Sequence, residues 1–260
     1  MTSIRKELIV DNYVKAYEQL SKCSGMFTFV QEDRIQRCES NIPLGPINSV
    51  LTYQRSETKD PIDEVKELED AYAAEGRKLI WLTYSHQPDE LVEQALQVNE
   101  FQSIEEMTGF GLLLEDWTSD LFIHGLDVRP VQSEAELESY RALALAGFEI
   151  PDNMADIFSK IFVDGPTQDK AFHHYVAYME GEPVTTLTTF EADGVVGIYN
   201  VATPAGHRRR GYARTAIAHV LRELQHRGVK EAAIIATPMA MSVYPSVGFK
   251  EEFKIRVYSK

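Results

Sequence analysis

Residues 170–228 constrain the fold more than any other stretch, because three strand-like segments are followed by the clearest helix of the chain. The three segments are KAFHHYVAYMEG, EPVTTLTTFEADG and VVGIYNVAT. The first two meet at Gly181-Glu182, and Asp193-Gly194 between the second and third is a strong hairpin turn. The helix GYARTAIAHVLRELQHRG then ends at Gly228. This pattern predicts three strands joined by hairpins and then a long helix.

Strand-like and helical segments also alternate through the rest of the chain. Helical spacing of apolar residues predicts helices over residues 3–22, 61–78, 88–101, 133–148 and 150–165. A short helix, broken at Pro245, is expected over residues 238–249. Strands are expected over residues 26–31, 79–84, 107–116, 126–131, 231–237 and 250–258, with a loop leading into another strand at 39–54. Ser133 followed by Glu136 is a capping box at the start of one helix. The alternation predicts an α/β or α+β fold.

The two halves of the chain differ in charge, which suggests two domains. Residues 1–120 contain 11 Lys and Arg against 23 Asp and Glu, a net charge of −12, whereas residues 121–260 contain 15 against 17, a net charge of −2. The segment WTSDLFIHG interrupts the alternation, so we place the boundary there, between domains of residues 1–122 and 123–260. An acidic half repels nucleic acid and anionic lipid and attracts a cationic ligand, although its charge also serves solubility.

The composition excludes several classes of protein. Hydrophobic residues make up 44% of the chain, which is enough for a packed core, yet the sequence has no apolar run long enough to span a membrane. The start of the chain lacks the apolar region and cleavage site of a secretory signal. Cys23 and Cys38 cannot form a disulfide framework, and no Cys/His spacing matches a zinc site. We therefore expect a cytoplasmic protein without a metal.

The stretch HRRRGYARTA, residues 207–216, places an arginine cluster between a strand and the long helix. The first amides of a helix lack intrahelical partners and carry partial positive charge, so this end favours an anion. Gly211 and Ala213 are small enough to let a phosphate approach the backbone. The surrounding cations are Arg208, Arg209, Arg210 and Arg214. Without an anion they would oppose the helix dipole, and nucleic acid would need an extended basic face, so a pyrophosphate is the preferred ligand.

Three segments of this half resemble the GNAT superfamily of acyl-CoA N-acyltransferases. Arg208 to Ala213 fits the pyrophosphate motif of that family, [RQ]-x-x-G-x-[GA], while GIYNVAT resembles its splayed fourth strand and SVYPSVGF its C-terminal segment. The order of elements after residue 126 also matches. Pro204 lies seven residues before Gly211, where many members have a proline six before, which leaves the loop between them in doubt. The resemblance implies a mixed, mainly antiparallel sheet flanked by helices.

The resemblance also implies roles for individual residues. The end of the splayed strand would hold the pantetheine arm through Val201, Ala202 and Thr203. The loop and the start of the helix would hold the pyrophosphate through Arg208, Arg209, Arg210, Gly211, Tyr212, Ala213 and Arg214. Tyr244 matches the tyrosine that protonates the leaving CoA thiolate, and Ser242 would contact the CoA arm.

The general base has several candidates. His174 has a suitable ordinary pKa, but it alternates with His173 across a strand, and a structural histidine is the common alternative. Glu149 follows the first helix of the domain, near where substrates would enter. Tyr199 and Asn200 on the splayed strand could contact the substrate, and a chain of water molecules could carry the proton instead.

The N-terminal half resembles the degenerate GNAT-like domain that precedes the catalytic one in some two-domain members. The segments that carry this resemblance are IPLGPINSVL, LIWLTYSHQPDELVEQALQVNEF and MTGFGLLLED. Asn99-Glu100-Phe101 departs from the Gly-Phe ending of the family, and no R-x-x-G-x-[GA] occurs before residue 120. Two tandem GNAT-like domains are therefore implied, of which the first binds no CoA and shapes the substrate cleft.

The function implied by the resemblance is transfer of an acetyl group from acetyl-CoA to a primary amine, by direct attack in a ternary complex. The acceptor would be a small-molecule amine or an amino terminus, and the acidic half favours a cation such as a polyamine or an aminoglycoside. Neither nucleic acid nor a membrane is expected as a partner, and a homodimer is compatible with the sequence. The alternative is a non-catalytic CoA-binding sensor or regulatory protein, but the arginine loop together with Tyr244 favours the enzyme.

Overall fold

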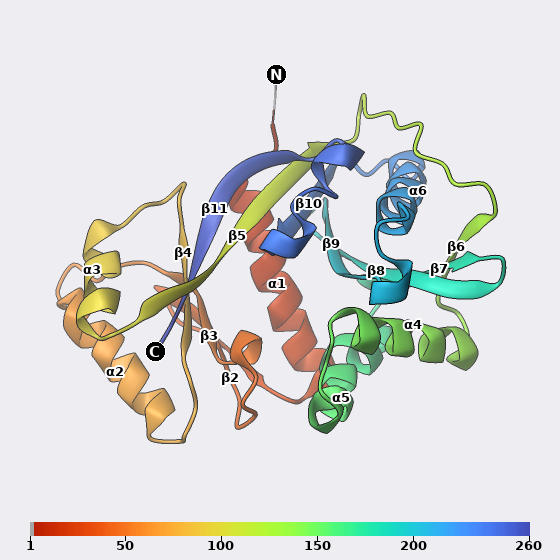
Figure 1. Cartoon of the computed structure of the whole chain (residues 1–260). Coiled ribbons are helices and arrows are strands. Elements are labelled where there is room, and N and C mark those ends of the chain that lie inside the picture. The colour runs from red at the N-terminus through yellow and green to blue at the C-terminus, as the bar shows by residue number, and fades with distance from the viewer. Residues whose placement is uncertain (1–2) are drawn as a thin grey trace. The chain divides into compact units, whose positions relative to one another are not determined.

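The computed structural model describes residues 3–260, and these form two compact units (Figure 1). The large unit consists of the chain up to Ser24 together with Phe110–Glu252, and the small unit consists of Gly25–Gly109 and Phe253–Lys260. Strands β5 (Gln102–Leu113) and β11 (Lys250–Ser259) each contribute residues to both units. The fold is the expected mixed α/β type with a mainly antiparallel sheet flanked by helices.

In the large unit the strands follow the order β5-β10-β9-β8-β7-β6. Its other elements are α1 (Lys6–Ser24), β6 (Leu126–Pro130), α4 (Glu134–Gly147), α5 (Asp152–Ser159), β7 (Phe172–Met179), β8 (Glu182–Ala192), β9 (Val195–Ala202), α6 (Tyr212–His226) and β10 (Glu231–Ala236). Strands β6 to β9 pair antiparallel with their neighbours, and β9 pairs parallel with β10. Helices α4 and α6 pack against β8 from its two sides (Figure 1).

The hairpins and the helix cap follow from local sequence. Asp193 and Gly194 both have positive φ, 50° and 78°, which the turn that best matches the twist of a hairpin requires. The first turn lies at Glu180-Gly181, one residue earlier than expected, because these two residues have φ of 52° and 86°. The Ser133 hydroxyl accepts a hydrogen bond from the Glu136 N–H, which confirms the predicted cap.

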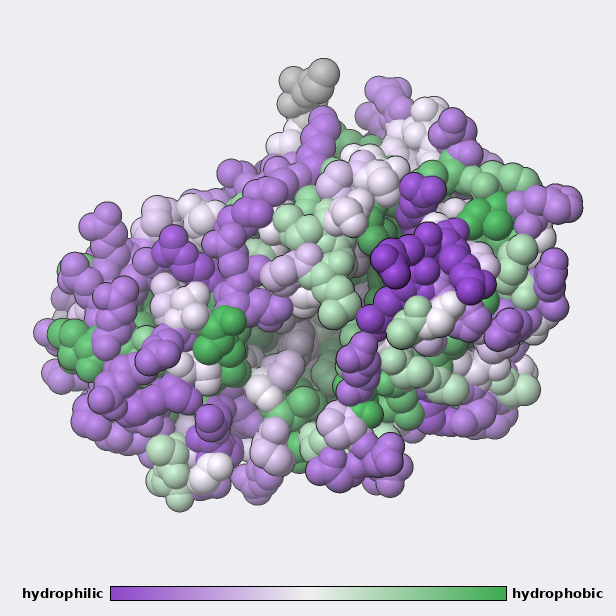
Figure 2. Space-filling view, viewed as in Figure 1, coloured by the Kyte–Doolittle hydropathy of each residue, from purple (hydrophilic) through white to green (hydrophobic). Residues whose placement is uncertain are grey.

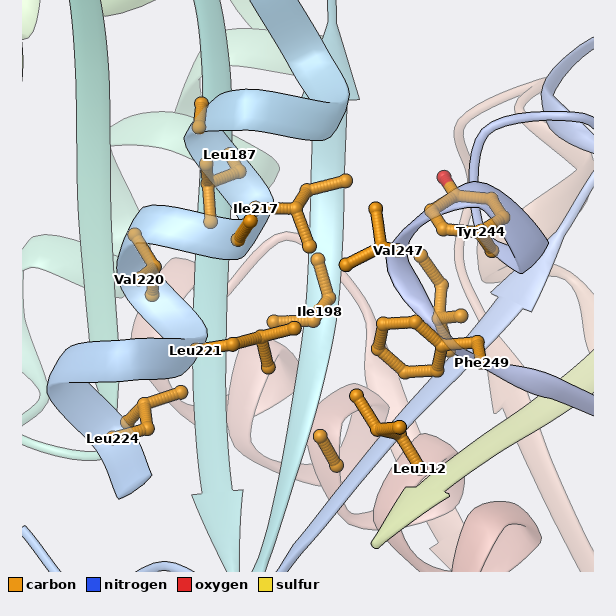
Figure 3. Packing of buried hydrophobic residues seen from close by; sticks show 14 of the residues in the cluster. Leu112, Leu187, Ile198, Ile217, Val220, Leu221, Leu224, Tyr244, Val247 and Phe249 are labelled. Carbon is orange, nitrogen blue, oxygen red and sulfur yellow. The ribbon is translucent and has the colours of Figure 1, made fainter. Parts of the chain in front are cut away.

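The core of the large unit forms around α6. Apolar residues of this helix face the strands, and Figure 3 shows Ile217 and Leu221 of α6 close to Leu187 of β8 and Ile198 of β9. All four side chains are buried. The spacing of four residues between Ile217 and Leu221 places both on one face of the helix, which explains why the sequence predicted this helix so clearly.

Helix α1 belongs to the large unit, whereas the sequence placed it in a first domain of residues 1–122. Its buried Asn12 side chain donates to the Val195 carbonyl (3.1 Å) and accepts from the Tyr199 hydroxyl (2.7 Å), so that α1 is bound to β9. The segment that seemed to divide the domains is also packed into this unit, since the Trp117 indole N–H donates to the Val247 carbonyl at 2.8 Å. The division therefore falls within β5, between Gly109 and Phe110.

The small unit has a sheet in the order β1-β2-β3-β4-β11-β5. Its further elements are β1 (Thr28–Gln31), β2 (Ile35–Glu39), β3 (Ser49–Tyr53), α2 (Pro61–Ala73), β4 (Ile80–Tyr84) and α3 (Glu90–Val98). Trp81 of the expected strand is fully buried at the centre of its core. The sequence analysis missed β2, because the adjacent polar residues Gln36 and Arg37 interrupt the apolar pattern of the strand.

The short helix expected over residues 238–249 is broken at Pro245 as predicted, but its two parts are single 3₁₀ turns, Pro238–Ala240 and Pro245–Val247, and not α-helix. Proline has no N–H and clashes with the preceding turn of an α-helix, so Pro245 can only begin a new turn. The second turn ends at Gly248, whose φ of 110° no ordinary side chain adopts readily. These turns fix the position of Tyr244, which directly precedes the second one.

Candidate active site

Strands β9 and β10 separate at one end, as expected for a splayed strand. Parallel pairing joins Val195 with Glu231 and continues to Gly197 with Ala233. Beyond these pairs β9 runs on to Ala202 while it stays paired with β8 on its other side. The backbone at the end of β9 is therefore open toward β10, which creates a place where an extended ligand can bind between two strands.

A β-bulge lies in the separated part of β9. Tyr199 pairs with Thr188 and Ala202 with Thr186, so one extra residue is accommodated in β9. Asn200 takes up the irregularity with a φ of 48° and donates from its side chain to the Phe162 carbonyl at 3.1 Å. Bulges of this kind bend a strand and redirect its groups, and they are common next to active sites.

The arginine loop leads directly from this strand end into α6. Arg209 and Gly211 both have positive φ, 61° and 83°, so the chain turns sharply before the helix starts at Tyr212. Gly211 is the cap residue, and no side chain caps this helix end. The first amides of α6 therefore remain available to an anion, as the sequence predicted.

The four arginines of this region divide into two kinds. Arg209, Arg210 and Arg214 are exposed, and a strongly hydrophilic patch covers the loop before α6 in Figure 2. Arg208 is half-buried and donates to the carbonyls of Thr203 and Gly147, each at 2.9 Å. Arg208 therefore holds the end of β9 against the end of α4, whereas the other three arginines can reach a ligand.

Glu149 is brought to the same place. Its carboxylate is exposed and forms an ion pair with Arg208 at 3.1 Å. Gly147, two residues earlier, lets α4 approach β9 so closely that a Cβ there would lie 2.8 Å from the Cβ of Ala202 and 3.0 Å from the Thr203 N. The sequence analysis did not single out Gly147, although a glycine in the last turn of a helix is a recognisable sign of close packing.

Tyr244 is 4% exposed and lies at the edge of the core. Its ring packs against Phe110 and Phe249, with ring centres 5.8 Å and 6.1 Å away, and its hydroxyl points away from the hydrophobic cluster in Figure 3. Burial raises the pKa of this phenol above its ordinary value. The phenol therefore stays protonated at neutral pH. Ser242, two residues earlier, is exposed.

His174 lies in the core, which argues against its candidacy as general base. Its Nε2–H donates to the Val163 carbonyl at 2.9 Å, and its Nδ1 accepts from the Thr188 hydroxyl at 2.7 Å. Its ring centre is 4.3 Å from that of Tyr140, and burial lowers its pKa to about 4. With both nitrogens engaged, His174 is a structural histidine, while His173 faces the opposite, exposed side of β7.

Tyr212 is buried in the core cluster, so only its backbone can face a ligand. Ala202 is likewise buried, while Val201, Thr203 and Ala213 are half-buried. Within residues 3–260, no three His, Cys, Asp or Glu side chains are grouped to hold a metal ion. No helix in this same range is long and apolar enough to cross a membrane.

Residues 137–249 match the family model for the acetyltransferase (GNAT) family. The fold is similar to that of a GCN5-related N-acetyltransferase from Kribbella flavida, with a TM-score of 0.71 and 19% identity over 95% of this chain and 94% of that one. No curated protein matches the sequence.

Two further solved structures share the fold across both units. A conserved protein of unknown function from Staphylococcus epidermidis has a TM-score of 0.70 at 14% identity, over 90% of this chain and 94% of that one. A tandem GNAT protein from the clavulanic acid biosynthesis pathway has a TM-score of 0.61 at 9% identity, over 100% of this chain and 97% of that one. The two-domain GNAT fold is thus matched over the whole length of the chain.

Proposed function

We propose that the protein transfers an acetyl group from acetyl-CoA to a primary amine, because residues 137–249 match the family model for the acetyltransferase (GNAT) family and the chain has a fold similar to that of a tandem GNAT protein. The observation that carries this proposal is the opening between β9 and β10 directly before the uncapped start of α6. An extended arm with a pyrophosphate at one end has the shape that such a site would hold.

The donor would bind along the separated end of β9. Carbonyls next to this end already accept hydrogen bonds, that of Asn200 from Thr186 (3.0 Å) and that of Ala202 from Thr185 (2.9 Å). We therefore assign the main pantetheine contact to the backbone of Val201, with Ala202 and Thr203 completing the strand end.

The pyrophosphate would bind the first amides of α6, from Tyr212 to Arg214. The side chains of Arg209, Arg210 and Arg214 would add charge around it. Arg208 supports the loop from behind, through its contacts with Thr203 and Gly147. Ser242 is exposed and available to the CoA arm.

The chemistry needs no covalent intermediate with the protein. The amine would attack the thioester carbonyl, the carbon–sulfur bond would break, and the thiolate would take a proton from Tyr244. The attacking amine must lose a proton, and since His174 is excluded by its burial, we propose Glu149 as the acceptor, directly or through water. The small unit would bind no CoA and would act in acceptor recognition.

The test is release of free CoA thiol from acetyl-CoA in the presence of a panel of primary amines. Thiol release that depends on an amine, and that falls in Tyr244→Phe, supports the enzyme. Binding of acetyl-CoA without thiol release with any amine would favour the CoA-binding sensor instead.

A further inference from the structure

The large unit contains an apolar cavity of about 80 Å³ between α1, the strands β8 and β9, and the turn that follows α5. Its walls include Ala16, Tyr17 and Leu20 of α1, Phe162 of the turn, and Tyr199 and Asn200 of β9. Within the described residues, no charged side chain lines it. No step of the proposed acetyl transfer involves this cavity.

The few polar groups in the walls are engaged elsewhere. The Tyr199 hydroxyl donates to Asn12, and the Asn200 amide donates to the Phe162 carbonyl. The Thr188 hydroxyl lies 2.5 Å from that of Tyr140 and donates to His174. The cavity therefore offers an apolar surface, and a cation inside it would have no counter-charge.

The cavity lies against the part of β9 that directly precedes the proposed pantetheine contact. Asn200 directly precedes Val201, to which we assign the pantetheine contact. Ile198 faces the core around α6, so Tyr199 faces the opposite side of the sheet, where α1 lies. The pyrophosphate site belongs to the α6 side, which leaves the α1 side for the attacking acceptor.

The volume limits what can enter. An engineered apolar cavity of about 150 Å³ holds benzene, and the present cavity of about 80 Å³ is roughly half as large. A flexible aliphatic group of three or four carbons can adapt its shape to this small space, which suits it better than a rigid, planar phenyl ring. Polar sugars or polyamines would leave hydrogen-bonding groups unpaired against aromatic walls.

We propose that this cavity binds a three- or four-carbon aliphatic group of the acceptor, so that the acceptor is a short aliphatic amine and not a polyamine or an aminoglycoside. This inference rests on the proposed function. Helix α1, which supplies one wall, lies outside residues 137–249, so this specificity comes from a part of the chain beyond the family match.

The experiment is calorimetric titration of ethylamine, isobutylamine and phenethylamine into protein saturated with CoA. Burial of two further carbons predicts about tenfold tighter binding of isobutylamine than of ethylamine. Ala16→Leu should fill the cavity and abolish that difference. Phe162→Ala should enlarge it and make phenethylamine bind better, a gain that a misfolded protein cannot show.

The control is Leu224→Ala, which truncates a buried apolar residue of the α6 core outside the cavity walls. It should leave the order of the three amines unchanged. Equal binding of the amines, or binding of none, overturns the inference. A chain-length preference that appears among acyl-CoA donors instead, and is lost in Ala16→Leu, also overturns it. Acetyl-CoA affinity is measured in every variant, because failure of the wild type to bind acetyl-CoA would reject the proposed function itself.

Discussion

The strand–helix–strand element β9–α6–β10 of the large unit has a counterpart in β3–α2–β4 of the small unit. In the large unit parallel pairing ends at Gly197 and Ala233, and in the small unit it joins only Ser49 with Ile80 and Val50 with Trp81. In each unit the first strand continues past the last pair and leads through a loop into the helix. The backbones are thus alike, and the difference lies in the side chains at the helix start and between the strands.

The start of α2 is closed by acidic groups of the chain itself. The Asp60 side chain accepts from the Ile62 N–H at 2.9 Å, and Pro61 has no N–H to offer a ligand. Asp63 adds negative charge to the first turn, and the buried Glu64 beside it is ion-paired with Arg34. An anion would be repelled here, whereas the glycine cap and arginines of α6 would attract one.

The space between β3 and β4 is also filled. The Tyr84 hydroxyl donates to the Leu51 carbonyl at 2.7 Å, so this side chain occupies a backbone group of the strand end. The Tyr53 ring packs against Trp81 in a tilted arrangement, with ring centres 5.1 Å apart, and its hydroxyl donates to the Glu64 carboxylate. The comparison teaches that one backbone arrangement can be open or closed to a donor, depending on a few side chains.

The largest expected effect is on kcat, which should respond to loss of the Tyr244 hydroxyl in the large unit and not to loss of the Tyr84 hydroxyl in the small unit. If Tyr244 protonates the leaving thiolate, Tyr244→Phe should lower kcat by about 10²- to 10⁴-fold, because a general acid contributes that much. Acetyl-CoA affinity should stay the same. Tyr84→Phe should leave kcat unchanged and lower the free energy of unfolding by about 1 kcal/mol, for one lost hydrogen bond. Steady-state kinetics measure kcat in both variants. If Tyr244→Phe has the same kcat as the wild type, Tyr244 is not the general acid.

The next effect concerns the acid sensitivity of the large unit. His174 has a pKa of about 4 in the folded chain against an ordinary value of 6.5, so the unfolded chain binds the proton first. The free energy of unfolding is therefore highest above pH 6.5 and falls by roughly 3 kcal/mol as the pH is lowered toward 4.

Urea unfolding between pH 4 and 7 measures this loss. His174→Gln should flatten the pH dependence, while the exposed His226→Gln should leave it as in the wild type. An equal slope in wild type and His174→Gln would show that the buried histidine is not its source.

A smaller effect compares the two helix starts. Reversing the exposed charges in Arg209→Glu with Arg210→Glu should weaken acetyl-CoA binding about tenfold or more, and salt should weaken the wild type in the same direction. Asp60→Ala should leave acetyl-CoA binding unchanged and cost about 1 kcal/mol of unfolding free energy, as the loss of a helix cap does. A change in acetyl-CoA affinity in Asp60→Ala would contradict the conclusion that the start of α2 binds no acetyl-CoA.

Features that depend on neighbours in the sequence were predictable. The Asp193-Gly194 turn and the end of α6 at Gly228 follow from residues that adopt positive φ, and the arginine loop follows from its place between a strand and a helix. The elements after residue 126 were predicted on the same basis, with two differences. The helix expected over residues 150–165 ends at Ser159 and continues as a π-helix, Lys160–Asp164, and the two parts of the helix broken at Pro245 are 3₁₀ turns.

Features that depend on distant contacts were not predictable. Asn12 binds the Val195 carbonyl 183 residues away, so nothing near α1 in the sequence shows that it belongs with β9. His174 is excluded as a base because Val163 and Thr188 engage its two nitrogens. Arg208 likewise turns away from the ligand side because it donates to the carbonyl of Gly147, the last residue of α4.

The most direct test of the open helix start uses the same substitution at both ends of α6. Gly211 and Gly228 have nearly equal φ of 83° and 87°, so aspartate imposes similar backbone strain at either end. Acetyl-CoA affinity should be measured by calorimetry in the wild type, in Gly211→Asp and in Gly228→Asp. We predict that the wild type and Gly228→Asp bind acetyl-CoA alike and that Gly211→Asp loses binding. Equal affinity in the two variants, or no binding by the wild type, would contradict a donor site at the start of α6.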